Sequence, residues 1–246
     1  MDNFKSYHND YTQSSSIGFF PGGFKPPHNG HFAALQSMLG YDVMNPETGK
    51  AILLDGSVTS DFVYVIIGHA PRGSQSQNDM YNKAKRSKAS DQELSGITET
   101  MITKEMSQEI WNMYIKQADQ SLADKVNISI SNSPSPVVGM EQAILSLKPK
   151  QIANSTINLY AGAEDQARYQ YFVSDKFKLK ISEQHNISPE KINIKANLLD
   201  RLGSATDVRS QILRVAAQEA DIQTLEKMLP AGVSIPDFLN LVKKFR

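Results

Sequence analysis

One stretch of sequence decides how this chain folds: Gly18-Phe19-Phe20-Pro21-Gly22-Gly23-Phe24-Lys25-Pro26-Pro27-His28-Asn29-Gly30-His31-Phe32. It predicts a short apolar strand, Ile17 to Phe20, and then a turn at Pro21-Gly22-Gly23, where the lack of a Cβ lets the backbone approach a ligand. A helix follows, with Asn29 as its N-cap and His31 to Leu39 as its body. This order directs backbone N–H groups and the positive end of the helix dipole at one place, which is typical of a phosphate site.

Three side chains in this stretch are suited to bind an oligophosphate: Lys25, His28 and His31. The two histidines are three residues apart, so they share one side of the first helical turn. Lys25 adds a positive charge just before them. The alternative is a pair of histidines that only satisfy the helix start, and the flanking glycines and lysine favour the phosphate site over it.

The run Gly-Gly-Phe-Lys-Pro-Pro-His-Asn-Gly-His resembles the signature of the HxGH nucleotidyltransferases. This superfamily includes nicotinamide-mononucleotide and phosphopantetheine adenylyltransferases and glycerol-phosphate cytidylyltransferases. Its pattern, Gly-x-Phe-x-Pro-x-His-x-Gly-His, is met at every fixed position: Gly22, Phe24, Pro26, His28, Gly30 and His31. Two residues depart from common usage, since Lys25 replaces a small polar or acidic residue and Gly23 replaces Ser, Thr or Arg.

Composition narrows the class of protein. The 246 residues carry 26 Lys and Arg against 26 Asp and Glu, so the formal net charge is zero, and we expect neither nucleic acid nor membrane as a partner. The absence of cysteine excludes disulfides and thiolate metal sites. No apolar run approaches the roughly 20 residues that span a bilayer. Residues 1–16 lack the regions of a signal peptide, so a cytoplasmic location is expected.

Apolar runs alternate with helical patterns, which predicts an α/β fold: a Rossmann-like, doubly wound parallel sheet with helices on both faces. A flexible arm over residues 1–16 and a single nucleotidyltransferase domain over 17–246 are expected. After the first strand, the predicted strands are 61–68, 126–130, 157–161 and 191–195, and the predicted helices include 103–120, 137–147 and 210–218.

Two connections are longer than such folds need and are interpreted as insertions. Residues 41–60 hold turn signals around an apolar piece, Ala51 to Leu54, and suggest a small hairpin. Residues 74–96 are polar with a basic run, 83–88, and are interpreted as a solvated loop or lid. A nucleic-acid patch is the weaker alternative, because only Tyr81 accompanies the charges.

Arg72 and Trp111 are the candidates for binding an acceptor molecule. Arg72 follows the apolar strand 61–68, at the sheet edge where open α/β folds bind ligands, so it is a candidate for a phosphate contact. A solvated loop arginine is the alternative. Trp111 is the only tryptophan and could stack on a ligand ring, although an aromatic residue beside an apolar helix face also fits the core.

A second motif, Gly203-Ser204-Ala205-Thr206-Asp207-Val208-Arg209, resembles the Ser-x-Thr-x-x-Arg element of the same superfamily. The resemblance implies that Ser204 and Thr206 hold the far phosphates and that Arg209 neutralises them. A looser likeness links Gly162-Ala163-Glu164-Asp165 to the Gly-x-Asp of the family, with Asp165 one residue late. Asp165 is thereby a nucleotide-binding candidate, or else a favourable charge at a helix start.

The resemblance implies transfer of a nucleoside monophosphate from a nucleoside triphosphate to a phosphorylated small molecule, with release of pyrophosphate. The implied catalytic residues are His28, His31, Lys25 and Arg209, with nucleotide contacts from Gly22, Gly23, Phe24 and Gly30. Mg²⁺ is expected on the phosphates, with no metal site made by the protein alone. ATP with an acceptor such as nicotinamide mononucleotide is favoured. The alternatives are CTP with a polyol or sugar phosphate, and a nucleotide-binding protein without turnover; assembly into a homo-oligomer stays open.

Overall fold

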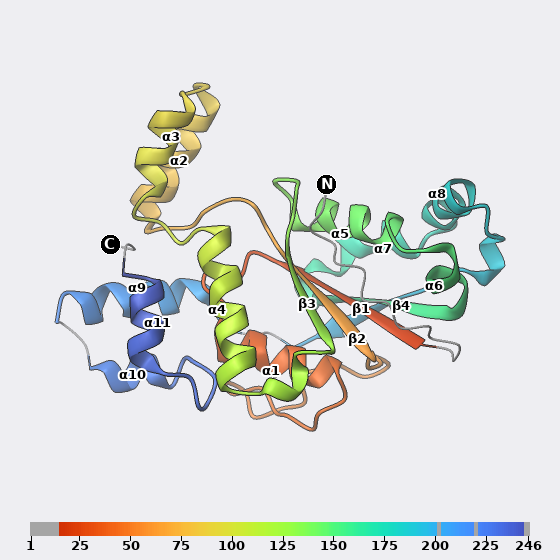
Figure 1. Ribbon diagram of the computed structural model, residues 1–246, viewed down its shortest axis with the longest axis horizontal. Coiled ribbons are helices and arrows are strands. Elements are labelled where there is room, and N and C mark those ends of the chain that lie inside the picture. Colours follow the sequence, from red (N-terminus) through yellow and green to blue (C-terminus); the bar gives the residue numbers. More distant parts are fainter. Residues whose placement is uncertain (1–14, 201–202, 219–220, 244–246) are drawn as a thin grey trace.

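The computed structural model describes residues 15–200, 203–218 and 221–243. Within them, one fully parallel sheet has the strand order β3-β2-β1-β4-β5 (Figure 1). This order confirms the predicted Rossmann-like, doubly wound α/β fold. The strands are β1 (Ser15–Gly22), β2 (Phe62–Ile67), β3 (Val126–Ile130), β4 (Ser155–Gly162) and β5 (Asn193–Leu199).

Helices cover both faces of the sheet, as predicted (Figure 1). One face carries α1 (Asn29–Met38), α4 (Lys104–Gln117), α9 (Ala205–Ala216), α10 (Ile222–Glu226) and α11 (Ile235–Leu241). The other carries α5 (Pro136–Leu145), α6 (Pro149–Asn154), α7 (Gln166–Val173) and α8 (Asp175–His185). Short 3₁₀ helices span Gln120–Leu122, Ala163–Asp165 and Pro189–Lys191.

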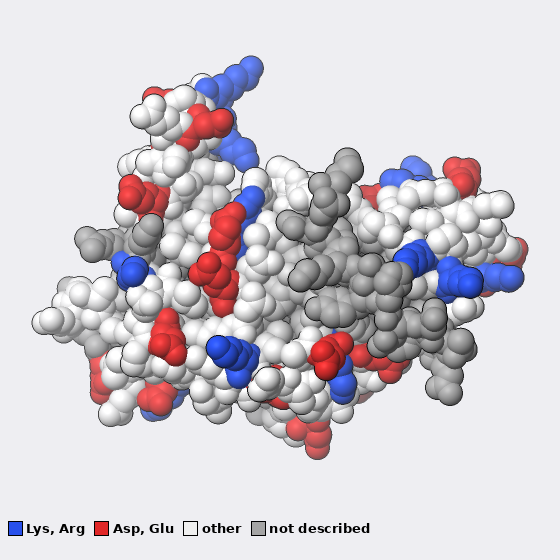
Figure 2. Space-filling view, in the orientation of Figure 1, with Lys and Arg blue, Asp and Glu red and all other residues white. Residues whose placement is uncertain are grey.

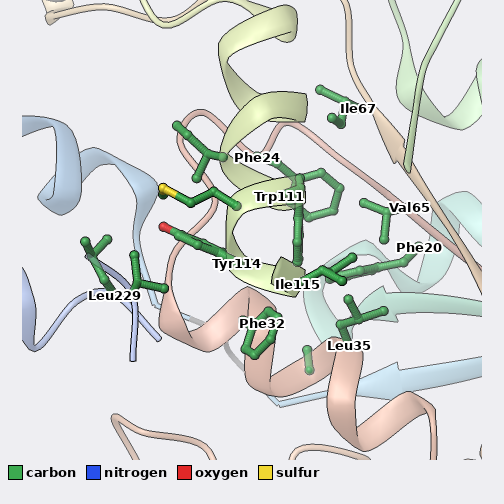
Figure 3. Packing of buried hydrophobic residues seen from close by; sticks show 14 of the residues in the cluster. Phe20, Phe24, Phe32, Leu35, Val65, Ile67, Trp111, Tyr114, Ile115 and Leu229 are labelled. Carbon is green, nitrogen blue, oxygen red and sulfur yellow. The ribbon is translucent and has the colours of Figure 1, made fainter. Parts of the chain in front are cut away.

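The central strand β1 supplies side chains to both cores because successive residues point to opposite faces. Phe19 is fully buried in the core that also contains residues of α5, α7 and α8, whereas Phe20 belongs to the core that contains residues of α1 and α4. Figure 3 shows this second core, where the Phe32 ring of α1 lies edge-on to Tyr114 of α4, at 6.0 Å between ring centroids. The register pairs Gly22 with Ile67, so the glycine turn begins beside the end of β2.

The prediction of a solvated loop over residues 74–96 was wrong, because the segment forms a helical hairpin. Its helices are α2 (Gln75–Arg86) and α3 (Asp91–Thr98), and they project away from the sheet (Figure 1). A capping box starts each one, Ser74 with Gln77 and Ser90 with Glu93. Neither helix contains a buried residue. Figure 2 shows basic and acidic side chains on this projection.

The segment 41–60 pairs mainly with β5 rather than with itself. Its local pairing is a single antiparallel bridge between Met44 and Ala51, which is all that the structure has of the predicted hairpin. A second bridge joins Leu53 to Leu199 at the end of β5, and the Leu54 N–H donates to Leu198 O at 3.0 Å. The insertion therefore lies against the carboxyl end of the sheet, where ligands of such folds bind.

Several predicted boundaries move. Strand β1 starts at Ser15, inside the predicted arm, and the remaining residues 1–14 lie outside the described part of the chain. Strand β5 runs to Leu199, four residues past the prediction, and helix α9 starts at Ala205 rather than Ser210. None of the helices in the described ranges is both long and apolar enough to cross a membrane.

Candidate functional site

The start of helix α1 is capped by two histidines. His28, and not the predicted Asn29, is the N-cap, since its Nδ1 accepts the Gly30 N–H at 3.1 Å. His31 Nδ1 in turn accepts the His28 N–H at 3.3 Å. A neutral imidazole that accepts at Nδ1 carries its proton on Nε2. Both side chains therefore hold the tautomer in which Nε2–H is a hydrogen-bond donor.

The Nε2–H donor of His28 has no acceptor among the described residues. The side chain is buried, and its Nε2 has no hydrogen-bond partner among the described residues. Burial lowers the pKa of His28 to about 4, and burial together with the nearby His28 lowers the pKa of His31 well below its usual value. Both are neutral at pH 7. A buried donor without a partner costs about 1–3 kcal/mol, which an acceptor oxygen from a ligand would recover.

The glycine turn is shaped by Phe24. A Cβ on Gly22 would lie 2.5 Å from the Phe24 ring, whereas one on Gly23 would meet nothing within 4 Å. The packing of Phe24 thus requires a glycine at position 22, and the contact of Gly22 with a nucleotide stays a prediction. Phe24 has a φ of 46°, and its ring packs edge-on against His31 at 5.0 Å between centroids. A left-handed φ at a bulky residue is uncommon and recurs at functional sites.

Lys25 lies inside the protein and ties two strands together. Its Nζ donates to Gly68 O at 2.5 Å and to Gly23 O at 2.9 Å, which joins the glycine turn to the end of β2. Burial and then the charge of Arg72 lower the pKa of Lys25 to about 7. The side chain therefore positions the turn, and it is not among the residues that line the pocket described below.

Arg209 of the second motif, residues 203–209, is hydrogen-bonded to the first motif at Lys25. This buried guanidinium donates from Nη1 to Lys25 O at 2.5 Å and from Nη2 to Thr206 Oγ1 at 2.8 Å. Ser204 caps helix α9, because its Oγ accepts the Thr206 N–H at 3.2 Å. A second helix start thus lies against the first motif, and both helix N-termini contribute positive partial charge there.

Lys25, Arg72 and Arg209 gather here without a direct ion pair among the described residues. Arg72 is exposed, and its charge lowers the pKa of both Lys25 and Arg209, after burial in each case. Among the described residues, none of these three forms an ion pair with a carboxylate. Lys104 adds a further cation in contact with His69 Nε2. Like charges held together raise the local potential, and an anion would relieve it.

A pocket of about 520 Å³ opens at the carboxyl ends of β1, β4 and β5. Its volume is in the range of small-molecule sites. The lining residues come from the glycine turn, the start of α1, the end of β4 and the entry to α9: Phe20, Pro21, Gly22, Gly23, Phe24, His31, Gly162, Asp200, Gly203 and Ser204. Asp200 was not predicted, although its place directly after the last residue of β5 is the kind of position where such folds bind ligands.

Eight predicted site residues are not among those that line the pocket: Lys25, His28, Gly30, Arg72, Trp111, Asp165, Thr206 and Arg209. Asp165 pairs with Arg168 at 2.8 Å, and Thr206 holds Arg209 instead. Gly30 is buried in the first turn of α1. Trp111 is fully buried, edge-on to Phe24 at 5.5 Å between ring centroids, so the structure corrects its predicted ligand role to a core role (Figure 3).

The residues present do not form a metal site by themselves. In the described ranges, no three His, Asp or Glu side chains cluster so that they could hold a metal ion. Asp200 is the one carboxylate among the residues that line the pocket. A Mg²⁺ ion here would take most of its ligands from phosphate oxygens and water, as Mg²⁺ commonly does.

The fold and the site define a Rossmann-like α/β protein with a pocket at the carboxyl ends of its strands. No protein-family model matches the chain, and no curated protein matches it. Among solved structures, it is similar to a protein of Vibrio parahaemolyticus described as a nicotinate-nucleotide adenylyltransferase. The TM-score is 0.44 and the identity 15%, over 92% of this chain and 99% of that one.

A second similar structure is the Plasmodium falciparum nicotinic acid mononucleotide adenylyltransferase complexed with APC. The TM-score is 0.45 and the identity 11%, over 92% of this chain and 94% of that one. At such low identities and TM-scores, neither likeness carries residue roles or chemistry over to this chain. The site has to be interpreted from its own residues.

Proposed function

We propose that residues 17–246 form a nucleotidyltransferase. It would transfer a nucleoside monophosphate, with AMP favoured, from a nucleoside triphosphate to a phosphorylated small molecule such as nicotinamide mononucleotide. The observation that carries this proposal is the meeting of the two motifs, in which Arg209 donates to Lys25 O and to Thr206 Oγ1 beside the histidine pair. His31 and the start of helix α9 at Ser204 line one pocket, and the buried residues His28, Lys25 and Arg209 belong to the same two motifs. This arrangement favours an oligophosphate ligand.

The reaction needs positioning and charge stabilisation rather than a base. An oxygen of the acceptor phosphate, already ionised, attacks the α-phosphorus and forms a new P–O bond. The bond from that phosphorus to the oxygen shared with the β-phosphate breaks, and pyrophosphate leaves with the electron pair. Negative charge grows on the leaving group, where the Nε2–H groups of His28 and His31 would donate.

Arg72 would bind the phosphate of the acceptor. Two backbone hydrogen bonds with Ile102, of 3.0 and 2.8 Å, fix the main chain of Arg72. The guanidinium therefore extends from a fixed position of the backbone. Its charge lowers the pKa of both Lys25 and Arg209, which supports a role for Arg72 beside the first motif. Mg²⁺, carried on the phosphates, would supply further neutralisation of charge when bound.

The test is pyrophosphate release from purified protein with Mg²⁺, crossing ATP and CTP against nicotinamide mononucleotide, glycerol phosphate, sugar phosphates and phosphopantetheine. One productive pair is expected, and His31→Ala should lower its rate by orders of magnitude while circular dichroism stays unchanged. His185→Ala is the matched control, because this histidine lies on α8 and bonds Leu145 O. Full turnover in His31→Ala would contradict the proposal. Release with CTP alone would favour the cytidylyl alternative.

A further inference from the structure

The insertion 41–60 reaches the pocket through Asp200. We propose that the Asp200 carboxylate binds the ribose hydroxyls of the nucleotide, and that Asn45 and Thr48 of the insertion position it; this inference rests on the proposed function. Asp200 is the one carboxylate of the pocket lining. It directly follows Leu199, the last residue of β5.

Two donors of the insertion fix the orientation of this carboxylate. Asn45 Nδ2 lies 3.1 Å and Thr48 Oγ1 2.9 Å from the same oxygen, Asp200 Oδ2. The Asp200 N–H donates to Ile52 O at 2.8 Å, so the backbone is held by the insertion as well. Asn45 is 1% exposed, and its Oδ1 accepts the Glu47 N–H at 2.9 Å, which fixes the amide itself. A carboxylate held from both side chain and backbone is pre-organised for binding.

The insertion is in turn anchored to the sheet by buried polar contacts. The Val58 N–H donates to Asn197 Oδ1 at 2.9 Å, and Asn158 Nδ2 donates to Ser60 Oγ at 2.9 Å. Asn158 and Asn197 are fully or almost fully buried on β4 and β5. These contacts anchor the end of the insertion to β4 and β5.

The charge of Asp200 decides which part of a nucleotide it can face. An ionised carboxylate only accepts hydrogen bonds, and it repels phosphate oxygens. The phosphates are therefore directed toward the glycine turn and His31, where donors gather. The neutral donors that remain on a nucleotide are the ribose hydroxyls and a base amino group. Two adjacent hydroxyls match one carboxylate, and carboxylates near strand ends bind ribose in related folds.

The experiment measures binding by calorimetry, with Mg²⁺, for ATP, 2′-deoxy-ATP, 3′-deoxy-ATP, ITP and inorganic tripolyphosphate. The wild-type protein should bind ATP about tenfold or more tightly than either deoxy analogue, the size expected for a hydrogen bond to a charged group. ITP should bind like ATP. Asp200→Asn should remove most of the difference and leave tripolyphosphate affinity unchanged or raised. Thr48→Val, which removes one positioning donor, should reduce the difference only in part.

Asp55→Asn is the matched control, since it makes the same chemical change at an exposed residue of the same insertion, outside the pocket lining. Equal binding of ATP and both deoxy analogues by the wild type would overturn the inference. Weaker binding of ITP than of ATP would also overturn it, because it would assign Asp200 to the base. A loss of tripolyphosphate affinity in Asp200→Asn as large as the loss of ATP affinity would do the same, because it would assign Asp200 to the phosphates or their metal ion. If the wild type binds none of the five probes, the proposed function itself fails.

Discussion

His28 caps a helix and holds a donor ready for a ligand, and it can do both only while neutral. Protonation of Nδ1 would end its acceptance of the Gly30 N–H. Burial enforces the neutral state by lowering the pKa of His28 to about 4. The residue proposed to bind phosphate thus also stabilises the start of α1. Protonation of His28 should therefore weaken both ligand binding and the stability of the fold.

We expect the free energy of unfolding to fall as the pH falls from about 6.5 to about 4. In that window the unfolded chain, in which His28 has its ordinary pKa, binds more protons than the folded one. The shift corresponds to about 3 kcal/mol at most. His28→Asn, which keeps a capping side chain without a titrating group, should make the dependence shallower. Urea unfolding at pH 7.5, 6.0 and 5.0 measures it, and an unchanged slope would contradict the role of His28.

Among single residues, the sequence predicted site residues that belong to a motif. It missed those that come to the pocket only through the fold. Motif spacing brought His31 and Ser204 to one pocket, and their role there stays a prediction. Asp200 has no motif, because its position follows from where β5 ends and from contacts with the insertion. The sequence left two roles open for Trp111, because an aromatic residue at this helix position can pack in the core or stack on a ligand. Its packing against Phe24 shows the core role.

Among the elements, the hairpin of α2 and α3 stands apart because it contributes nothing to the core. Neither helix contains a buried residue, and the chain enters and leaves it beside the Arg72–Ile102 bridge. We expect that replacing residues 75–98 with a short Gly-Ser linker changes the free energy of unfolding by less than about 1 kcal/mol, as is usual for surface changes. Denaturant unfolding of the shortened chain measures this.

Phe238→Ala is the comparison for the shortened chain. Phe238 is fully buried on α11, so this single substitution should cost about 3–5 kcal/mol. A shortened chain that loses as much stability as Phe238→Ala would show that the hairpin supports the fold after all. Retained stability would leave α2 and α3 available for a role outside the core.

The elements that the sequence predicted well are those whose pattern is set by burial. A continuous apolar run predicted β2, because a strand covered on both faces has no polar side. Helices α2 and α3 were missed because their sequences lack an apolar stripe, although their capping boxes were visible. The pairing of Leu53 with Leu199 joins segments far apart in the chain, so no local pattern could have predicted it.

For the whole molecule, a net charge of zero hides an uneven distribution. Lys25, Arg72 and Arg209 gather at one end of the sheet, without an ion pair among the described residues. Burial and then the charge of Arg72 lower the pKa of Lys25 and of Arg209, and so oppose the charged forms of these two side chains. Stability is thereby lower in the free protein than it would be with an anion bound, a trade-off that is common at functional sites.

Inorganic tripolyphosphate should therefore raise the melting temperature of the wild-type protein, and less so at high salt, because the attraction is electrostatic. Arg72→Gln removes the exposed member of the cluster, so the free protein should melt at the same or a higher temperature while the rise on adding tripolyphosphate shrinks. Arg214→Gln, at an exposed arginine in the last turn of α9, is the control and should leave the rise unchanged. Thermal melts of the three proteins, with and without tripolyphosphate at two salt concentrations, measure both effects. An equal rise in wild type and Arg72→Gln would separate Arg72 from the anion site and leave Lys25, Arg209 and the two histidines to account for it.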